Sequence, residues 1–259
     1  MSETISARHP KWYRAGLKLW GAFESQLGFE VSPDSSKNIS HANTHLRDAA
    51  AGVFVNHQRI ADTPVAISFL LAHLPNAGDM MGPAGMKHFD FRRDPISAAV
   101  FRMLPPLGIR PIPVVQDGDS QNYSERERQD MLNRLKAESS MAIVSPGGIY
   151  GIAPEGTRSH DGTLQSSKRG LGYLPGYDPD GRLLYVPVGL IYKNKTLGTE
   201  QNEIRVGEPF AFSDLDLDEH QLPEDRKGGA QFIADAMMYR LAAILPESMR
   251  GVYALDELD

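Results

Sequence analysis

A histidine and an aspartate that could share acid–base chemistry, His57 and Asp62, lie five positions apart in the stretch VFVNHQRIADTP, residues 53–64. The β-branched apolar run at residues 52–55 predicts a buried strand, and the change of period after it places His57 on the loop that leaves this strand. An aspartate that accepts a hydrogen bond from one imidazole nitrogen fixes the tautomer and leaves the other nitrogen free to take a proton. The spacing therefore indicates a general base, although an ordinary buried pair of the same residues explains this stretch equally well.

A second stretch, IYGIAPEGTRS at residues 149–159, repeats the arrangement of a strand-like run that ends in polar residues. Gly156 permits a tight turn that exposes backbone amides, Thr157 adds a hydroxyl donor, and Arg158 adds a guanidinium that suits phosphate oxygens. These residues predict a loop that holds a phosphate. Taken alone, Arg158 is explained as well by a salt bridge, for example to Glu155.

The segment SKRG, residues 167–170, places two more cations beside a glycine downstream of that loop. Lys168 is the one that we expect to meet the same anion, because backbone amides and a nearby ammonium group together form an anion site. The alternative is that Lys168 and Arg169 form a solvated surface, which is the usual place for isolated cations.

Both stretches belong to an alternation of short apolar runs and longer amphipathic runs that begins at residue 51. This alternation predicts an α/β fold in which helices flank a central, mixed but mostly parallel sheet. Asp62, Thr63 and Pro64 predict the start of a helix, with the aspartate or the threonine as its N-cap. We expect strands near residues 51–55, 78–81, 109–115, 149–153, 184–191 and 203–207, and helices near 62–74, 94–104, 123–144 and 228–245.

The N-terminal 40 residues are predicted to form a helical arm and a linker, which precede the main domain at residues 41–259. Residues 11–29 have amphipathic helical spacing and carry Trp12 and Trp20, so they predict a helix that either caps the core or lies on lipid headgroups. Residues 32–40, SPDSSKNIS, are polar with one proline and are typical of a linker.

The composition of the 259-residue chain limits the classes of function. The chain has no cysteine, which excludes disulfides, thiolate nucleophiles and cysteine-ligated metals. A formal net charge of −6 disfavours a nucleic-acid-binding protein. The N-terminus lacks an apolar signal core, and the longest apolar run, residues 65–74, is shorter than a membrane span of about 20 residues. We therefore expect a cytoplasmic protein, with any membrane contact peripheral and at the inner membrane surface.

Taken together, the two stretches resemble the signatures of the glycerophospholipid acyltransferase superfamily, which includes lysophosphatidate and glycerol-3-phosphate acyltransferases. The resemblance covers roughly residues 51–210, and two of its signatures are specific in combination. The matched residues are Asn56, His57 and Asp62 for the first signature, Pro154, Glu155, Gly156, Thr157 and Arg158 for the third, Val186, Pro187 and Val188 for the fourth, and Lys168 and Gly170 for the Lys-x-Gly that follows the third.

The second signature of that superfamily, a glycine followed six residues later by an arginine, is not matched. Counting from Gly108, the position of the arginine is occupied by Val114. The resemblance implies that this arginine binds the phosphate of the acceptor. The cations that could replace it are Arg110, or Arg92 and Arg93. The identity of the acceptor is therefore left open.

The resemblance implies acyl transfer from an acyl thioester, either acyl-CoA or acyl carrier protein, to a hydroxyl of a glycerol phosphate or lysophospholipid. It implies His57 as general base and Asp62 as the group that orients it, with neither an acyl-enzyme nor a metal or other cofactor. Gly156, Thr157, Arg158 and Lys168 would bind the acceptor phosphate, while Glu155 orders the loop. Two alternatives stay open: a thioester or lipid hydrolase in which water replaces the acceptor, and a non-catalytic lipid-binding protein.

Overall fold

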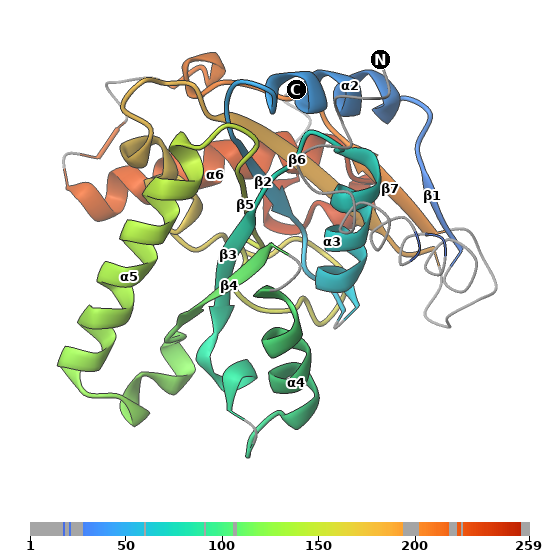
Figure 1. The fold of residues 1–259 in the computed structure, drawn as a ribbon. Helices are drawn as coiled ribbons and strands as arrows, with labels where there is room; N and C mark the ends of the chain where they lie inside the picture. Colours follow the sequence, from blue (N-terminus) through green and yellow to red (C-terminus); the bar gives the residue numbers. More distant parts are fainter. Residues whose placement is uncertain are drawn as a thin grey trace.

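A seven-stranded sheet forms the centre of the computed structural model, which describes residues 18, 21, 28–59, 61–90, 92–105, 108–193, 202–217, 222–223 and 225–254 (Figure 1). The strands follow the spatial order β1-β7-β6-β2-β5-β3-β4. Neighbouring strands of this sheet run parallel, except that β6 and β7 are antiparallel. The strand bounds are β1 (Phe29–Val31), β2 (Ala51–Val55), β3 (Met80–Gly85), β4 (Ile109–Val114), β5 (Ile149–Ile152), β6 (Leu184–Ile191) and β7 (Asn202–Val206).

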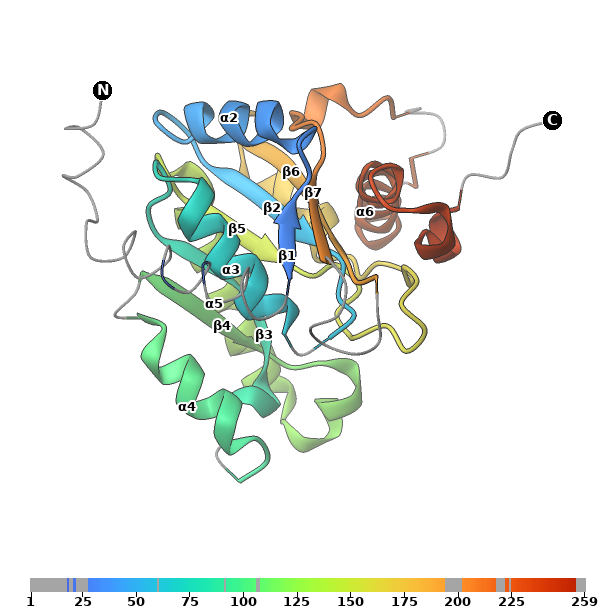
Figure 2. The ribbon, with the colours of Figure 1, turned by 90° about the vertical axis from the view of Figure 1, so that its right-hand side faces the viewer.

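Helices cover both faces of this sheet, which makes the protein a three-layer α/β fold. Figure 2 shows α6 on one side of the strands and α2 and α3 on the other. The helix bounds are α2 (Ser35–His45), α3 (Asp62–His73), α4 (Pro95–Met103), α5 (Glu125–Val144) and α6 (Arg226–Ala243). Short 3₁₀ helices are η2 (Met86–Phe89), η4 (Asp117–Asn122), η5 (Leu171–Tyr177), η6 (Phe212–Asp214), η7 (Glu247–Met249) and η8 (Gly251–Tyr253).

The two helical layers pack on alternate side chains of the same strands, as the period of two in a strand requires. On β2, Phe54 faces a core shared with α5 and α6, whereas its neighbour Val53 faces a core shared with α2 and α3. Both side chains are almost fully buried. Strands buried on both faces read as continuous apolar runs, and this is why AGVFV and LYVPVGLI stand out in the sequence.

The predicted α/β fold is confirmed, and every predicted strand and helix from residue 51 onward is present to within a few residues. The largest difference is at β3, which continues to Gly85 through Gly82 and Pro83. These residues weaken a strand signal, but Gly82 is required because a Cβ there would lie 2.0 Å from the carbonyl oxygen of Gly151 on β5.

The predicted linker at residues 32–40 is wrong, because most of it belongs to helix α2, which also contains the boundary expected at residue 40. Two polar side chains of α2 bond the end of β7. Ser35 Oγ accepts from the Val206 N–H at 2.9 Å, and Asn38 Nδ2 donates to the Val206 carbonyl at 2.9 Å. The polar composition therefore predicted a linker, although the segment is helical and two of its polar side chains bond β7.

The N-terminal helix predicted at residues 11–29 lies largely outside the described residues, as do both tryptophans. Lys18 and Gly21 are helical. Phe29 is not part of a helix, because it begins β1, is buried, and pairs with Asn202 of β7. Within the described part of the chain, no helix has the length and apolar character needed to cross a membrane.

Candidate active site

The loops that leave three adjacent strands meet at one edge of the sheet. His57 follows β2, Glu155 follows β5, and Tyr192 follows β6, and the sheet order places β2 between the other two strands. Because these strands are parallel, their carboxyl ends lie at the same edge. Open α/β sheets usually bind their ligands at this edge. The topology thus brings the first and third signatures together.

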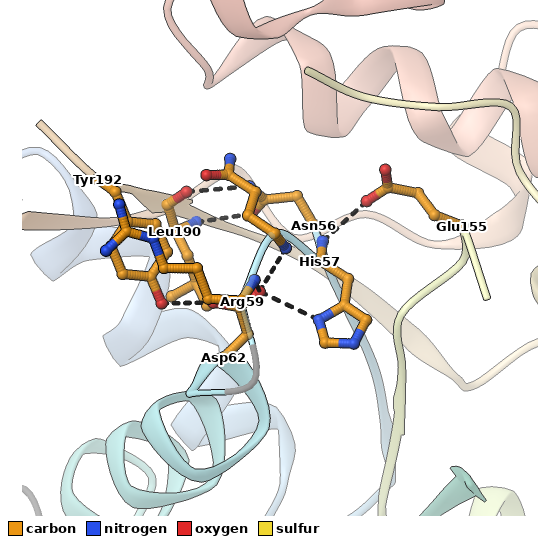
Figure 3. A network of polar contacts seen from close by, with 8 residues as sticks. Asn56, His57, Arg59, Asp62, Glu155, Leu190 and Tyr192 are labelled. Atoms are coloured by element: carbon orange, nitrogen blue, oxygen red, sulfur yellow. Dashed lines mark hydrogen bonds and ion pairs between the residues drawn. The ribbon is translucent and has the colours of Figure 1, made fainter. Parts of the chain in front are cut away.

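The imidazole of His57 is paired with the carboxylate of Asp62 (Figure 3). His57 Nδ1 lies 3.1 Å from Asp62 Oδ2, with 22% of the histidine side chain and 2% of the aspartate side chain exposed. A carboxylate can only accept, so a neutral His57 carries its proton on Nδ1 and presents a lone pair at Nε2. Among the described residues nothing bonds that Nε2, and the nitrogen needed by a general base is therefore open.

The carboxylate of Asp62 is held by four donors. Its Oδ2 accepts from His57 Nδ1 and from the backbone N–H groups of Gln58 and Arg59, the latter at 2.6 Å, and its Oδ1 accepts from the Tyr192 hydroxyl. Neither Asp62 nor Thr63 is the N-cap of α3, as the sequence had predicted, since that position is Ala61. Asp62 instead closes the turn that carries His57.

Tyr192 is a residue of this network that the sequence did not reveal. Burial and the adjacent Asp62 carboxylate both raise the pKa of the Tyr192 phenol, which therefore remains a protonated donor. Its ring is fixed by the guanidinium of Arg59, 4.1 Å from the ring centroid, and by an edge contact with Phe29 of β1. A tyrosine at a strand end carries no sequence signal of its own, because only the sheet order places it beside Asp62.

Asn56, the residue before His57, has a structural role in the same network. Its buried side-chain amide donates to the Leu190 carbonyl at 2.9 Å and accepts from the Leu190 N–H at 2.7 Å. This two-way bond continues the β2–β6 ladder beyond the end of β2. It fixes the point at which the chain turns toward His57.

Glu155 connects the His57 loop to the loop of the third signature. Its Oε1 accepts from the His57 N–H at 2.8 Å, and its Oε2 accepts from the Gln165 N–H at 3.0 Å. The Ser159 N–H also donates to the His57 carbonyl at 2.7 Å. The carboxyl of Glu155 is buried, and burial raises its pKa. Both carboxylate oxygens thus bond backbone groups, which is the ordering role expected for this residue.

The predicted anion-binding residues lie on that loop and on the segment that follows it. Gly156 has a left-handed φ of 67°, and a Cβ there would lie 3.0 Å from Cγ of Lys168. The Lys168 N–H donates to the Pro154 carbonyl at 2.7 Å. Thr157 and Lys168 line a hollow of about 520 Å³ next to Glu155. The structure therefore brings Glu155, Gly156, Thr157 and Lys168 into one neighbourhood.

Arg158 is exposed on the same loop and makes no ion pair with a residue that the structure describes. The salt bridge to Glu155 that could have explained it is absent from that part of the chain, because Glu155 bonds backbone amides instead. The guanidinium is consequently not neutralised by Glu155.

The cations considered for the unmatched second signature are placed differently. Arg110 is at the start of β4, the opposite edge of the parallel strands from His57, and pairs with Asp79 at 2.5 Å. It is therefore not positioned to replace the missing arginine. Arg93, after β3, pairs with Asp119 at 3.0 Å. The residue after β4 that does reach the third-signature loop is Gln116, whose Nε2 donates to the Gly156 carbonyl at 2.8 Å.

Neither comparison with known proteins returns a match. No protein-family model matches the chain, and no curated protein matches it. Within the described residues, no group of three or more His, Asp or Glu side chains could hold a metal ion. The chemistry of this site is accordingly inferred from its geometry and from the signatures in the sequence.

Proposed function

We propose that the protein is an O-acyltransferase that moves a fatty acyl group from an acyl thioester to a hydroxyl of a glycerol phosphate or lysophospholipid. One observation carries the proposal: a His57–Asp62 pair with an open Nε2 is joined through Glu155 to a loop of the anion-binding type. A buried structural pair would not need an exposed ring nitrogen. The signatures of the sequence supply the reaction class.

In the proposed reaction, His57 Nε2 takes the proton of the acceptor hydroxyl while the acceptor oxygen attacks the thioester carbonyl. The C–S bond then breaks, and the thiolate leaves with the proton that the imidazolium returns. Asp62 remains ionised throughout and stabilises the imidazolium. No acyl-enzyme forms, which agrees with the absence of cysteine from the sequence.

The acceptor phosphate is bound by the side chains of Arg158, Thr157 and Lys168, while the Gly156 N–H donates to the Ala153 carbonyl at 3.0 Å and so shapes the turn. Glu155 positions this loop relative to His57. The acyl donor, acyl-CoA or acyl carrier protein, is a substrate, and the proposal includes no cofactor. The cytoplasmic location and the peripheral membrane contact through the N-terminal segment belong to the same proposal.

Incubation of the purified protein with a labelled acyl thioester and a panel of acceptors tests the function. The panel contains glycerol 3-phosphate, 1-acylglycerol 3-phosphate, a lysophospholipid and buffer alone. We expect acylated acceptor to form only with a phosphate-bearing acceptor. Free fatty acid released at the same rate in buffer alone would identify a hydrolase, and no turnover of any thioester would leave a non-catalytic lipid-binding protein.

Replacing Arg158 by alanine tests the assignment of the acceptor site. Arg158→Ala should raise the KM for the acceptor about ten- to a hundredfold, the value of one charge-assisted contact, with little change in the KM for the thioester. Arg169→Ala is the matched control, since Arg169 is an exposed arginine just downstream, and it should leave both constants within about twofold. An effect confined to the thioester would reassign Arg158 to the donor.

A further inference from the structure

The C-terminal end of the described chain lies against the segment that carries Lys168. The Leu164 N–H donates to the Met249 carbonyl at 2.9 Å, and the Val252 N–H donates to the Leu164 carbonyl at 3.3 Å. Gly251 between them has φ 53°, and a Cβ there would lie 2.0 Å from the Leu164 oxygen. Only a glycine permits this approach of the two backbones.

A second tie lies one residue before Lys168. The Ser167 N–H donates to the Tyr253 hydroxyl at 2.8 Å, and that hydroxyl donates to Asp235 Oδ1 at 2.5 Å. Ser167 Oγ donates to the same Asp235 oxygen at 2.8 Å, and Gln231 Nε2 donates to the Ser167 carbonyl at 3.1 Å. Helix α6, which carries Gln231 and Asp235, thereby holds Ser167 through its backbone and its side chain.

The same C-terminal turn forms a wall of the hollow beside Glu155. Gly251 and Val252 line one part of it, while Gln165, Ser166 and Lys168 line another. The bonds to Ser167 and Leu164 therefore fix the distance between these walls. Burial, together with the bond to Asp235, raises the pKa of Tyr253 to about 12, so its hydroxyl stays a donor at every physiological pH.

We propose that Tyr253 and Asp235 are positioning residues for acceptor binding, which act by holding the Ser167–Lys168 segment against the C-terminal turn. The inference rests on the proposed function for the identity of the ligand, a phosphate-bearing acceptor. The hydrogen bonds themselves do not depend on it. Because these residues contact the segment that holds the phosphate, and not His57, their loss should weaken acceptor binding and spare the chemical step.

The test compares Tyr253→Phe and Asp235→Asn with wild type and with Tyr239→Phe. Tyr239 is the matched control, because it is a tyrosine of α6 in edge contact with Tyr253, is 44% exposed, and its hydroxyl bonds no described residue. Binding of glycerol 3-phosphate is measured by titration calorimetry, and kcat and both KM values are measured in the transferase assay. Thermal unfolding of each variant shows whether it is folded. If Tyr253→Phe or Asp235→Asn unfolds the protein, Ser167→Ala replaces it, because this change removes the Ser167 hydroxyl that bonds Asp235 and keeps the Tyr253 hydroxyl.

We expect Tyr253→Phe and Asp235→Asn to raise the Kd and the KM for the acceptor about three- to tenfold, the value of one or two hydrogen bonds. The kcat and the thioester KM should stay within about twofold, as should all constants of Tyr239→Phe. Folded variants with wild-type Kd would overturn the inference, as would a fall in kcat without a change in Kd, or a wild type that does not bind glycerol 3-phosphate. If the protein shows no transferase activity but binds glycerol 3-phosphate, and Tyr253→Phe weakens that binding, the proposed function is overturned and the inference is supported.

Discussion

At the scale of single residues, the candidate base depends on how completely Asp62 is bonded. A carboxylate has about four sites for donors, and Asp62 fills its sites with three N–H groups and the hydroxyl of Tyr192. A buried charge is tolerated when it is paired and bonded in this way. The orientation of the His57 ring is therefore set by a rigid acceptor, and the open Nε2 is a consequence of that orientation.

Removing the Tyr192 hydroxyl tests this dependence. Tyr192→Phe leaves Asp62 Oδ1 without its phenolic donor, so kcat should fall about two- to tenfold while both KM values change little. The measurement is steady-state kinetics beside Tyr239→Phe, a change of the same kind at a distant site. Unchanged kcat in Tyr192→Phe would show that three N–H donors suffice to hold Asp62.

Glu155 predicts a pH dependence of stability. Burial raises the pKa of this carboxyl above its ordinary value of 4.5. At a pH below that value, Glu155 is protonated in both the folded and the unfolded state. The folded state then carries no buried charge at this residue, and the contribution of Glu155 to the free energy of unfolding is at its maximum. As the pH rises, the unfolded state releases the proton first, so the contribution is lost progressively until the pH passes the raised pKa.

The loss of stability is measured by urea unfolding at several pH values between about 4 and about 8, roughly the range in which a buried carboxyl titrates. Stability of the wild type relative to Glu155→Gln should decline as the pH rises through this window. A difference between the two proteins that stays constant with pH would contradict a raised pKa for Glu155.

At the scale of elements, the sequence predicted the strands and helices from β2 to α6 and did not predict β1 and α2. Apolar runs with period two or continuous burial marked β2, β5 and β6, since both of their faces are covered. β1 is three residues long, too short for a periodic signal. Helix α2 was missed because most of its residues are polar, and two of them, Ser35 and Asn38, bond β7.

Ser35 shows what those polar contacts contribute. Ser35→Ala would leave the buried Val206 N–H without its acceptor, and we expect the free energy of unfolding to fall by about 1–3 kcal/mol. Ser36→Ala, at the exposed neighbouring position of α2, should change it by less than about 0.5 kcal/mol. If both substitutions have equally small effects on the free energy of unfolding measured in urea, the Ser35 contact does not stabilise the packing of α2 on β7.

At the scale of the whole molecule, the parallel sheet decides which sequence candidates can cooperate. His57, Glu155 and Tyr192 leave the carboxyl ends of adjacent strands, and Arg110 lies at the amino end of β4. The signatures predict His57, Asp62 and the third-signature loop as site residues. Tyr192, Gln116 and the Tyr253–Asp235 contact could not be predicted, because each depends on strand order or on packing between distant segments.

The proposed function depends on His57 acting as the base of a thioester-dependent acyl transfer. The most direct measurement is the rate of acyl transfer by His57→Ala, beside wild type and His88→Ala. His88 is a suitable control because it also follows a parallel strand and pairs with an aspartate, with Nδ1 2.9 Å from Asp94 Oδ2. We predict a loss of about a hundredfold to ten-thousandfold in kcat for His57→Ala and a change within about twofold for His88→Ala. A His57→Ala protein that is folded and transfers acyl groups at the wild-type rate would contradict the role of His57 as the base.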